Sequence, residues 1–261
     1  PDGIGIWQHD NKSVGFSHSR LAVIDLSTKG KQPMKGIDKN IITFNGEIYN
    51  YLELHRSLEG YWDFKSKTDT ECILASYYKF GEKCLENLRG MFSFALWDQK
   101  RQKLFCARDR FGIKPFYYTV IDGIFYFASE AKALIPFLKN IETNKHALAE
   151  YLTFQYSIGE KTLFEGIYQL LPGHALTVNN GNLKIWRYWD ISYDIDYSHN
   201  SKYFEEKLRA LVNDTISLHL RSDVEIGSYV SGGIDSSLMY KLASQYAGEK
   251  TKAFHGKFGE Y

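Results

Sequence analysis

A short apolar strand, a glycine-rich loop and a helix follow one another near the end of this chain, and their order restricts the fold strongly. Residues 226–230 predict the strand, residues 231–237 (Ser-Gly-Gly-Ile-Asp-Ser-Ser) predict the loop, and the helix is expected to run to about Gln245. Strands that alternate with helices are typical of a parallel sheet covered by helices. This part of the chain therefore predicts the beginning of an α/β domain.

The loop has the composition of a phosphate-binding site. Glycines let the backbone approach a ligand closely, and the start of the following helix offers unpaired N–H groups and a positive dipole end. Because Asp235 adds a carboxylate to this anion site, it predicts a Mg²⁺ ion held between the carboxylate and the phosphates. The Walker pattern GxxxxGK[ST] is absent, which excludes an ordinary P-loop nucleotidase. The alternative interpretation is a tight turn before a capped helix.

The first two thirds of the chain consist of short strand-like segments separated by turns, with a few helices. β-Branched and aromatic residues predict strands at residues 13–18, 21–25, 40–44, 91–98 and 103–109, the last two forming an antiparallel hairpin. Helices are predicted at residues 50–58, 69–80 (ended by Gly81) and 129–138. Asn179-Asn180-Gly181 predicts a second hairpin turn.

An acidic, aperiodic stretch at residues 190–200 divides the chain. After it, apolar residues recur every four positions and predict an amphipathic helix: Phe204, Leu208, Val212 and Ile216. We therefore expect a first domain at residues 1–190, a linker at 191–200 and the start of a second domain at 201–261.

Composition excludes several classes of protein. The formal net charge is only +1, so no general attraction to nucleic acid or to an anionic membrane is expected. No apolar run approaches the roughly 20 residues of a membrane span. The cysteine count is low and odd, which favours a reducing cytoplasm and predicts packed, unreactive thiols at Cys72, Cys84 and Cys106.

A second distinctive string is Phe-Asn-Gly-Glu-Ile-Tyr-Asn at residues 44–50. It places a carboxamide, an exposed backbone N–H and a carboxylate close together, so Asn45 and Gly46 could form an oxyanion hole. The alternative is a plain turn followed by a helix that Asn50 caps.

Together these strings resemble the glutamine-hydrolysing asparagine synthetases, and the matches cover essentially the whole chain in the family's order. Besides residues 44–50 and 231–237, the matching strings are residues 1–3, 18–25, 68–71, 88–95, 107–115, 127–130, 170–174 and 188–190. The resemblance implies an α+β fold. Its first part would be a four-layer αββα sandwich of the N-terminal nucleophile hydrolase type without its first strand. The start of a parallel-sheet ATP pyrophosphatase domain would follow, and the chain would be a piece truncated at both ends.

The resemblance also implies the residues of two sites. Glutamine would be bound by Arg20 and the Val23 backbone at its α-carboxylate, by Glu47 and Asp69 at its α-amino group, and by Asn45 and Gly46 at the oxyanion. The residue types agree, because a guanidinium suits a carboxylate and two acids suit an ammonium. The implied ATP-binding residues are Val230, Ser231, Gly232, Gly233, Asp235, Ser236 and Gly256, although residues 255–257 (His-Gly-Lys) depart from the family pattern.

The family's nucleophilic cysteine would precede Pro1, so this chain by itself is expected to be inactive as a glutaminase. Arg108, Asp109 and Arg110 are expected to brace the sheet as a charge network.

The implied function is asparagine synthesis from glutamine, aspartate and ATP with Mg²⁺ in a cytoplasmic enzyme. Its expected partners are these small molecules, with a homodimer as one possible assembly and no nucleic-acid or membrane partner. Two alternatives stay open: amidation of another carboxylate (a sugar acid, peptide or cell-wall component), or a ligase that resembles β-lactam synthetase. A glutamine-sensing module without catalysis is a third, which the intact Ser-Gly-Gly-Ile-Asp-Ser-Ser loop disfavours.

Overall fold

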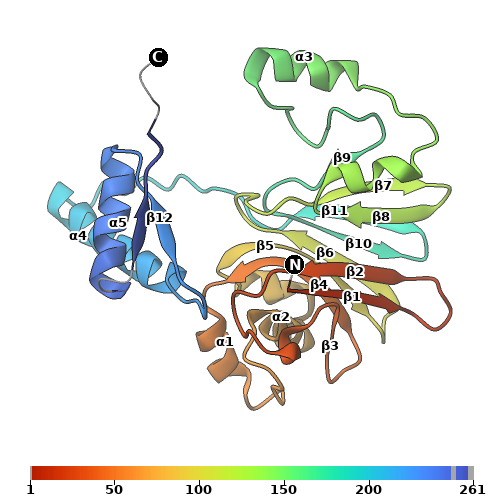
Figure 1. Cartoon of the computed structure of the whole chain (residues 1–261), viewed down its shortest axis with the longest axis horizontal. Helices are drawn as coiled ribbons and strands as arrows, with labels where there is room; N and C mark the ends of the chain where they lie inside the picture. Colours follow the sequence, from red (N-terminus) through yellow and green to blue (C-terminus); the bar gives the residue numbers. More distant parts are fainter. Residues whose placement is uncertain (1, 248–250, 258–261) are drawn as a thin grey trace. The chain divides into compact units, whose positions relative to one another are not determined.

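The computed structural model describes residues 2–247 and 251–257. It divides into two compact units (Figure 1). The first unit comprises Pro1–Leu21 with Ser27–Ile191, and the second comprises Ala22–Leu26 with Ser192–Tyr261.

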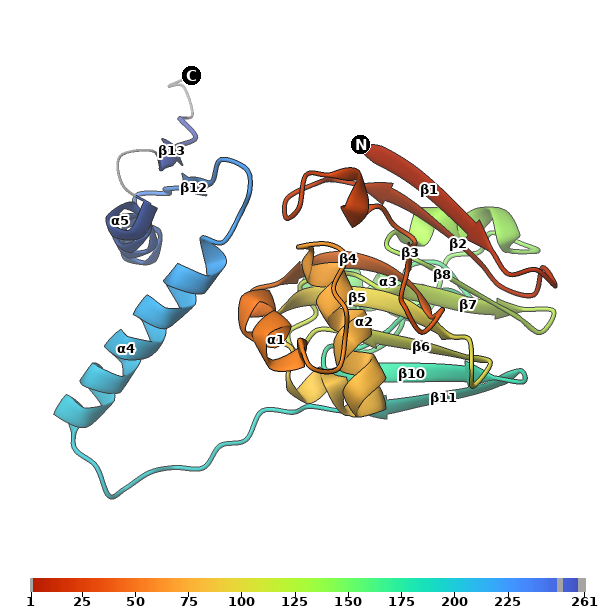
Figure 2. The same cartoon turned by 90° about the horizontal axis from the view of Figure 1, so that it is seen from below.

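A six-stranded antiparallel sheet is the centre of the first unit. Its strand order is β11-β10-β6-β5-β4-β3, and Figure 2 shows the five longer strands side by side. The strands are β3 (Met34–Lys35), β4 (Ile41–Ile48), β5 (Gly90–Asp98), β6 (Lys103–Arg108), β10 (His174–Asn179) and β11 (Asn182–Arg187). Both predicted hairpins are confirmed. Asn180 and Gly181 turn the second one with φ of 48° and 76°, the left-handed conformation that a tight hairpin needs.

Helices cover one face of this sheet. They are α1 (Tyr51–Leu58), α2 (Asp69–Phe80) and the short 3₁₀ segment η2 (Gly81–Glu86). The predicted C-cap is confirmed: Gly81 has φ of 59°, and its N–H bonds to the Tyr77 carbonyl. The helices pack on the sheet through fully buried side chains that include Ile73, Leu74, Phe92, Phe94 and Phe105, and burial of such apolar surface is the main stabilising term.

Two smaller sheets cover the opposite face. One is the hairpin β1 (Gly3–Gln8) and β2 (Gly15–Arg20), and the other has the order β8-β7-β9, formed by β7 (Tyr117–Ile121), β8 (Ile124–Ala128) and β9 (Tyr168–Gln169). A second core, which includes Phe16, Ala95, Leu104, Phe116 and Tyr118, joins them to the large sheet. The first unit is thus mixed α+β with a helix layer and two sheet layers, and the fourth layer of the expected αββα sandwich stays a prediction.

Two local predictions in the first two thirds of the chain are wrong. Residues 129–138 form the 3₁₀ segments η3 (Ala131–Ala133) and η4 (Ile135–Phe137) instead of one helix, because Pro136 lacks the N–H that an α-helix requires. Residues 21–25 form no strand. Asp25 has φ of 57°, and its N–H bonds to the Asp223 side chain at 2.7 Å instead of to a neighbouring strand.

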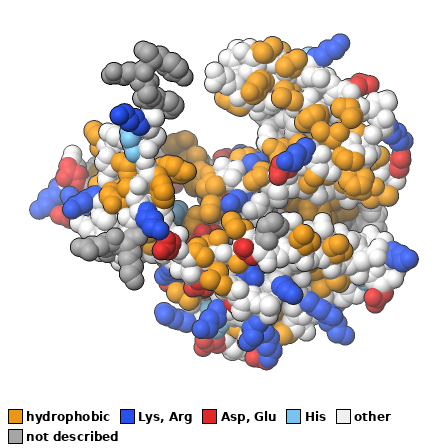
Figure 3. All heavy atoms as spheres, viewed as in Figure 1, with side chains coloured by type: hydrophobic (Ala, Val, Ile, Leu, Met, Phe, Trp, Pro, Cys, Tyr) orange, Lys and Arg blue, Asp and Glu red, His pale blue; other side chains and the backbone are white. Residues whose placement is uncertain are grey.

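The remaining elements of the first unit are η1 (Thr28–Gly30) and α3 (Lys145–Phe154). Hydrophobic side chains gather on the surface of α3 (Figure 3), among them Leu152 and Phe154, which are 75% and 51% exposed.

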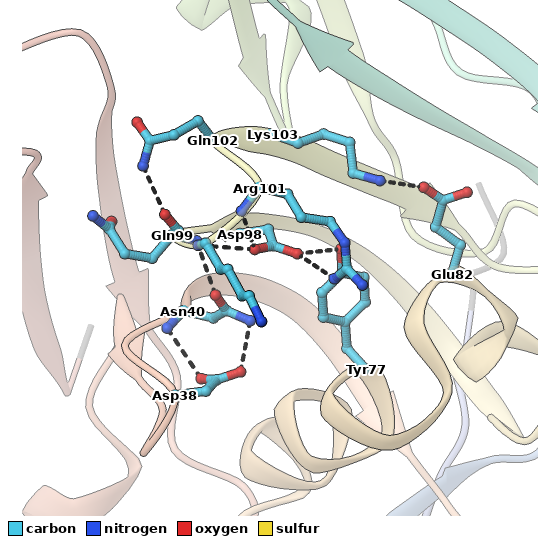
Figure 4. A network of polar contacts seen from close by, with 10 residues as sticks. Asp38, Asn40, Tyr77, Glu82, Asp98, Gln99, Arg101, Gln102 and Lys103 are labelled. Carbon is cyan, nitrogen blue, oxygen red and sulfur yellow. Dashed lines mark hydrogen bonds and ion pairs between the residues drawn. The ribbon is translucent and has the colours of Figure 1, made fainter.

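A buried polar cluster closes the β5–β6 hairpin (Figure 4). The Asp98 carboxylate accepts hydrogen bonds from the backbone N–H groups of Lys100 and Arg101 (3.0 and 2.8 Å), from the Arg101 guanidinium (2.8 Å) and from the Tyr77 hydroxyl (2.9 Å). Because Tyr77 belongs to α2, the cluster attaches the hairpin turn to the helix layer. The same Asp98 carboxylate also binds the backbone N–H groups of the turn.

The second unit contains α4 (Ser201–His219), β12 (Gly227–Tyr229), α5 (Ile234–Ala247) and β13 (Lys252–Phe254). The predicted parallel pairing is confirmed, because Gly227, Ser228 and Tyr229 lie opposite Lys252, Ala253 and Phe254. The amphipathic helix is also present, although Leu208 remains 63% exposed while Ile216 is buried. Within the described part of the chain, none of the helices is both long and apolar enough to span a bilayer.

Candidate functional site

The string Asn45-Gly46-Glu47 lies inside β4 and not after its end. These residues pair with Ser93, Phe92 and Met91 of β5. A Cβ atom on Gly46 would lie 2.1 Å from the Met91 carbonyl oxygen, and a Cβ on Gly90 would lie 2.2 Å from the Glu47 carbonyl oxygen. The two strands approach each other so closely that only glycine fits at either position. The glycine of the proposed oxyanion hole is therefore required by the sheet itself.

Asn45 extends its side chain toward the loop that follows β8. Its amide Nδ2 donates to the Ser129 Oγ at 3.3 Å. This contact orients the carboxamide, which is the group expected to stabilise an oxyanion.

Asp69 lies at the start of α2 and is buried. Its carboxylate accepts the Ile48 N–H at 2.9 Å and the Thr68 hydroxyl at 3.1 Å, which attaches α2 to the end of β4. Burial raises the pKa of Asp69 to about 6, although hydrogen bonds from Ile48, Thr68 and Thr70 act in the opposite direction.

Glu47 is the second acid of the pair and is half-buried. Burial and the neighbouring Asp69 raise the pKa of Glu47 to about 7, while the Lys114 ammonium acts to lower it. Because Asp69 disfavours the ionisation of Glu47, a cation beside the two carboxyl groups would favour their charged forms. The pair is therefore suited to an ammonium group.

Arg20 ends β2 with its guanidinium against the loop that contains η1. It donates to the Ser27 carbonyl at 2.9 Å, and a Cβ on Gly30 would lie 2.1 Å from its terminal nitrogen. Gly30 thus leaves the space that the guanidinium occupies. The neighbouring His18 bonds to Thr43 of β4 at 3.0 Å; burial and the Arg20 charge lower the pKa of His18, so the imidazole serves to attach β2 to the large sheet.

The predicted glutamine-binding residues do not all belong to one unit. Arg20, Asn45, Gly46, Glu47 and Asp69 lie in the first unit, whereas Val23 belongs to the segment counted with the second. The Val23 carbonyl accepts the Asp223 N–H at 3.0 Å, a contact within the second unit.

The expected charge network at residues 108–110 is a set of bonds to the main chain. Arg108 donates to the carbonyls of Lys114, Leu170 and Gly112 at 2.6–2.8 Å. Asp109 accepts N–H groups from Phe92, Phe111, Ile113 and Lys114, and Arg110 donates to the Leu88 carbonyl at 2.6 Å. The bracing role is as predicted, but its partners are backbone groups and not opposite charges.

Sequence reasoning missed Lys114, whose charge acts on Glu47. The sequence shows it only as one lysine inside the string at residues 107–115, with no partner visible nearby.

In the second unit, the glycine-rich loop connects β12 to α5. Gly232 has φ of 89°, which favours glycine, and α5 begins at Ile234 with Asp235 in its first turn. The Ser236 hydroxyl accepts the Ser231 N–H at 3.1 Å, which closes the loop. Val230 and Gly256 follow the two parallel strands, β12 and β13, and Val230 donates to the Phe254 carbonyl at 2.8 Å. The predicted ATP-binding residues therefore lie around the carboxyl ends of the two parallel strands, which is where open parallel sheets bind ligands.

The donor set of this loop fits Mg²⁺ only in the presence of phosphate. Among residues 2–247 and 251–257, no three His, Cys, Asp or Glu side chains are grouped to hold a metal. Mg²⁺ is commonly bound through one or two carboxylates plus substrate phosphates. Asp235 would therefore be the carboxylate ligand that the protein supplies.

The prediction of packed thiols is confirmed. All three cysteines are free and fully buried, and burial raises the pKa of each thiol: Cys72, Cys84 and Cys106. None of them presents a reactive thiolate.

Comparison with known proteins gives the family of each part of the chain. A family profile described as "Glutamine amidotransferase domain" matches residues 1–189, and one described as "Asparagine synthase" matches residues 207–261. "Asparagine synthetase [glutamine-hydrolyzing] 1" of Bacillus subtilis is 40% identical over 94% of this chain and 39% of its own length. "Amidase chry2" of Gibberella zeae is 35% identical over 97% of this chain and 38% of its own length.

Among solved structures, glutamine PRPP amidotransferase from B. subtilis gives a TM-score of 0.47 with 17% identity, over 93% of this chain and 51% of that one. The chain spans about two fifths of the length of these two curated relatives. It belongs to the glutamine amidotransferase domain family, and an asparagine synthase region begins after that domain.

Proposed function

We propose that the first unit binds glutamine and releases its amide nitrogen, and that the second begins an ATP-dependent ligase that transfers this nitrogen to aspartate. The observation that carries the proposal is the pair of acids beside Gly46. Glu47 follows Asn45 and Gly46 in β4, and Asp69 at the start of α2 accepts the Ile48 N–H at 2.9 Å, so the two acids lie in adjoining elements. The pKa of each is raised. A free α-amino acid with a side-chain amide supplies the groups that this arrangement suits.

Each group then has a defined task. Arg20 binds the α-carboxylate, the two acids bind the α-ammonium, and Asn45 with the Gly46 N–H stabilises the oxyanion that forms when the amide carbonyl is attacked. Hydrolysis converts glutamine and water to glutamate and ammonia. The family nucleophile is a cysteine at the mature N-terminus, and the three buried cysteines of this chain do not take that role.

In the second unit, the loop from Ser231 to Ser236 would hold the ATP phosphates, with Val230 and Gly256 at the edge of the nucleotide. Mg²⁺, bound by Asp235, would neutralise the phosphate charge. The aspartate carboxylate attacks the α-phosphate and pyrophosphate leaves; ammonia then attacks the acyl carbon and AMP leaves. Domain limits at residues 190 and 201, a cytoplasmic location and a homodimer remain predictions.

A different acyl acceptor is the second candidate. Two relatives at 35% and 34% identity are named amidases, chry2 and chyE, whereas the B. subtilis relative is named an asparagine synthetase. Amidation of another carboxylate, or a ligase that resembles β-lactam synthetase, would use the same two units. Supplying the whole protein with ATP, glutamine and each acceptor in turn distinguishes them, because only the true acceptor gives pyrophosphate in proportion to amide product.

The glutamine site is tested with Arg20→Ala in the whole protein. We expect glutamine-dependent synthesis to fall at least 100-fold, on the order of one lost charged contact in a desolvated site, while synthesis from ammonium persists. Arg56→Ala, at an exposed position of α1, serves as the matched control. Equal loss with glutamine and with ammonium would contradict a role confined to glutamine binding.

A further inference from the structure

The segment between β2 and η1 forms a loop whose two ends meet at Arg20. Residues 22–26 of this loop are counted with the second unit, although Arg20 and Ser27 on either side belong to the first. The Arg20 guanidinium donates to the Ser27 carbonyl at 2.9 Å. That contact can form only if the residues between them turn back, so the guanidinium depends on the conformation of the loop.

Asp223 holds the middle of this loop through two hydrogen bonds to the main chain. Its carboxylate accepts the Asp25 N–H at 2.7 Å, and its own N–H donates to the Val23 carbonyl at 3.0 Å. Asp25 and Ile24, the residue between the two bonded groups, are both buried. Asp223 lies in the turn between α4 and β12. A single residue thus supplies a donor and an acceptor to the loop, as a neighbouring strand would.

The conformation that Asp223 holds is one that the loop disfavours locally. Asp25 has φ of 57°, in the left-handed region that residues other than glycine adopt infrequently. The N–H that Asp223 accepts belongs to this same residue. Without the carboxylate, the left-handed turn loses a charge-assisted hydrogen bond, and a smaller fraction of molecules should contain it.

We propose that Asp223 is a positioning residue of the glutamine site: by holding the main chain of Val23 and Asp25, it keeps the loop in the conformation that lets Arg20 bind the substrate's α-carboxylate. The inference rests on the proposed glutamine-binding function and deepens it. Arg20 lies in the part of the chain that matches the amidotransferase profile, whereas Asp223 lies in the part that matches the asparagine synthase profile. A residue of the second part therefore completes the glutamine site of the first.

The size of the effect follows from the fraction of molecules whose loop is in the binding conformation. The apparent affinity of a site falls in proportion to that fraction. Loss of a hydrogen bond to a charged acceptor typically shifts such an equilibrium about tenfold or more. At saturating glutamine the bound substrate selects the competent loop, so KM should change and kcat should not.

The test measures glutamate release by the whole protein over a range of glutamine concentrations, with synthesis from ammonium in parallel. Asp223→Ala should raise the KM for glutamine about tenfold, change kcat less than about twofold and leave synthesis from ammonium intact. Asp223→Asn keeps an oxygen acceptor at the same place, so it should raise KM no more than about threefold. Glu206→Ala, at an acid of α4 that is 69% exposed, is the matched control and should behave as wild type.

A purely structural role for Asp223 predicts equal losses with glutamine and with ammonium, and this result would overturn the proposal. Asp223→Asn gives a second decision even where Asp223→Ala fails to fold, because a KM raised about tenfold in the amide variant contradicts the role of the acceptor. Wild-type KM in Asp223→Ala rejects only the role of Asp223. If the wild-type protein releases no glutamate from glutamine, the proposed function itself fails.

Discussion

Removing the Tyr77 hydroxyl tests the polar cluster that closes the β5–β6 hairpin. The hydroxyl donates to the Asp98 carboxylate at 2.9 Å, and the two residues are 3% and 1% exposed (Figure 4). Tyr77→Phe keeps the ring, which stacks on Phe105 at 5.4 Å between centroids, so only the hydrogen bond is lost. The carboxylate then stays buried with one donor fewer.

The expected loss follows from the charge on the acceptor. A hydrogen bond to a charged group contributes about 1.5–3 kcal/mol, and water cannot replace the missing donor at a site this buried. For a domain of this size, such a loss corresponds to a fall in Tm of about 3–12 °C.

Tryptophan fluorescence during urea or thermal unfolding gives a selective readout. All five tryptophans lie in the first unit: Trp7, Trp62, Trp97, Trp186 and Trp189. Their signal therefore reports unfolding of that unit alone. Tyr197→Phe, at a tyrosine 87% exposed, is the matched control and should leave the transition unchanged. A loss below about 0.5 kcal/mol for Tyr77→Phe would refute the argument from buried charge.

The stability difference between wild type and Tyr77→Phe should also depend on pH, and it should become smaller in acid. Burial acts to raise the pKa of Asp98, but hydrogen bonds from Arg101 and Tyr77 outweigh it and hold the pKa below the ordinary 3.8. The ionised cluster thus contributes its full stability above pH 3.8 and loses it as the pH falls through the lower folded pKa. The difference between wild type and Tyr77→Phe should accordingly be constant near neutrality and diminish in acid; a difference that grows in acid would contradict this sign.

Three further predictions concern the two sites and the thiols. Gly46→Ala should lower the stability of the first unit by about 1–3 kcal/mol in urea unfolding, because its Cβ would lie 2.1 Å from the Met91 carbonyl, whereas Gly60→Ala, with no atom within 4 Å, should not. In the whole protein, Asp235→Asn should abolish pyrophosphate release with either nitrogen source yet leave glutamate release intact; normal pyrophosphate release would argue against its metal role. A thiol reagent should label no cysteine until the first unit unfolds, and labelling of the native protein within minutes would show that burial does not protect Cys72, Cys84 or Cys106.

Features that depend on neighbouring residues could be predicted from the sequence. Asn180-Gly181 adopts the left-handed turn that its residue types favour, and Gly81 ends α2 with positive φ. The strand, loop and helix at residues 227–247 could also be predicted, because the pattern of each element's own residues is enough to indicate whether it is a strand, a loop or a helix. The same locality explains why the strings typical of the family were recognisable one by one.

Only the tertiary structure decided how the charged groups act. Glu47 and Asp69 are 22 positions apart, and their raised pKa values arise because β4 and α2 bury them together. Asp25 takes a left-handed conformation because its N–H bonds to Asp223, nearly 200 residues away, and no window around residue 25 contains that partner. The loop that carries Lys114 is likewise attached to the neighbouring strand β5, because one Asp109 carboxylate accepts the N–H groups of both Lys114 and Phe92. Burial and electrostatic coupling depend on which distant segments meet, and that is a property of the folded chain and not of any short stretch of it.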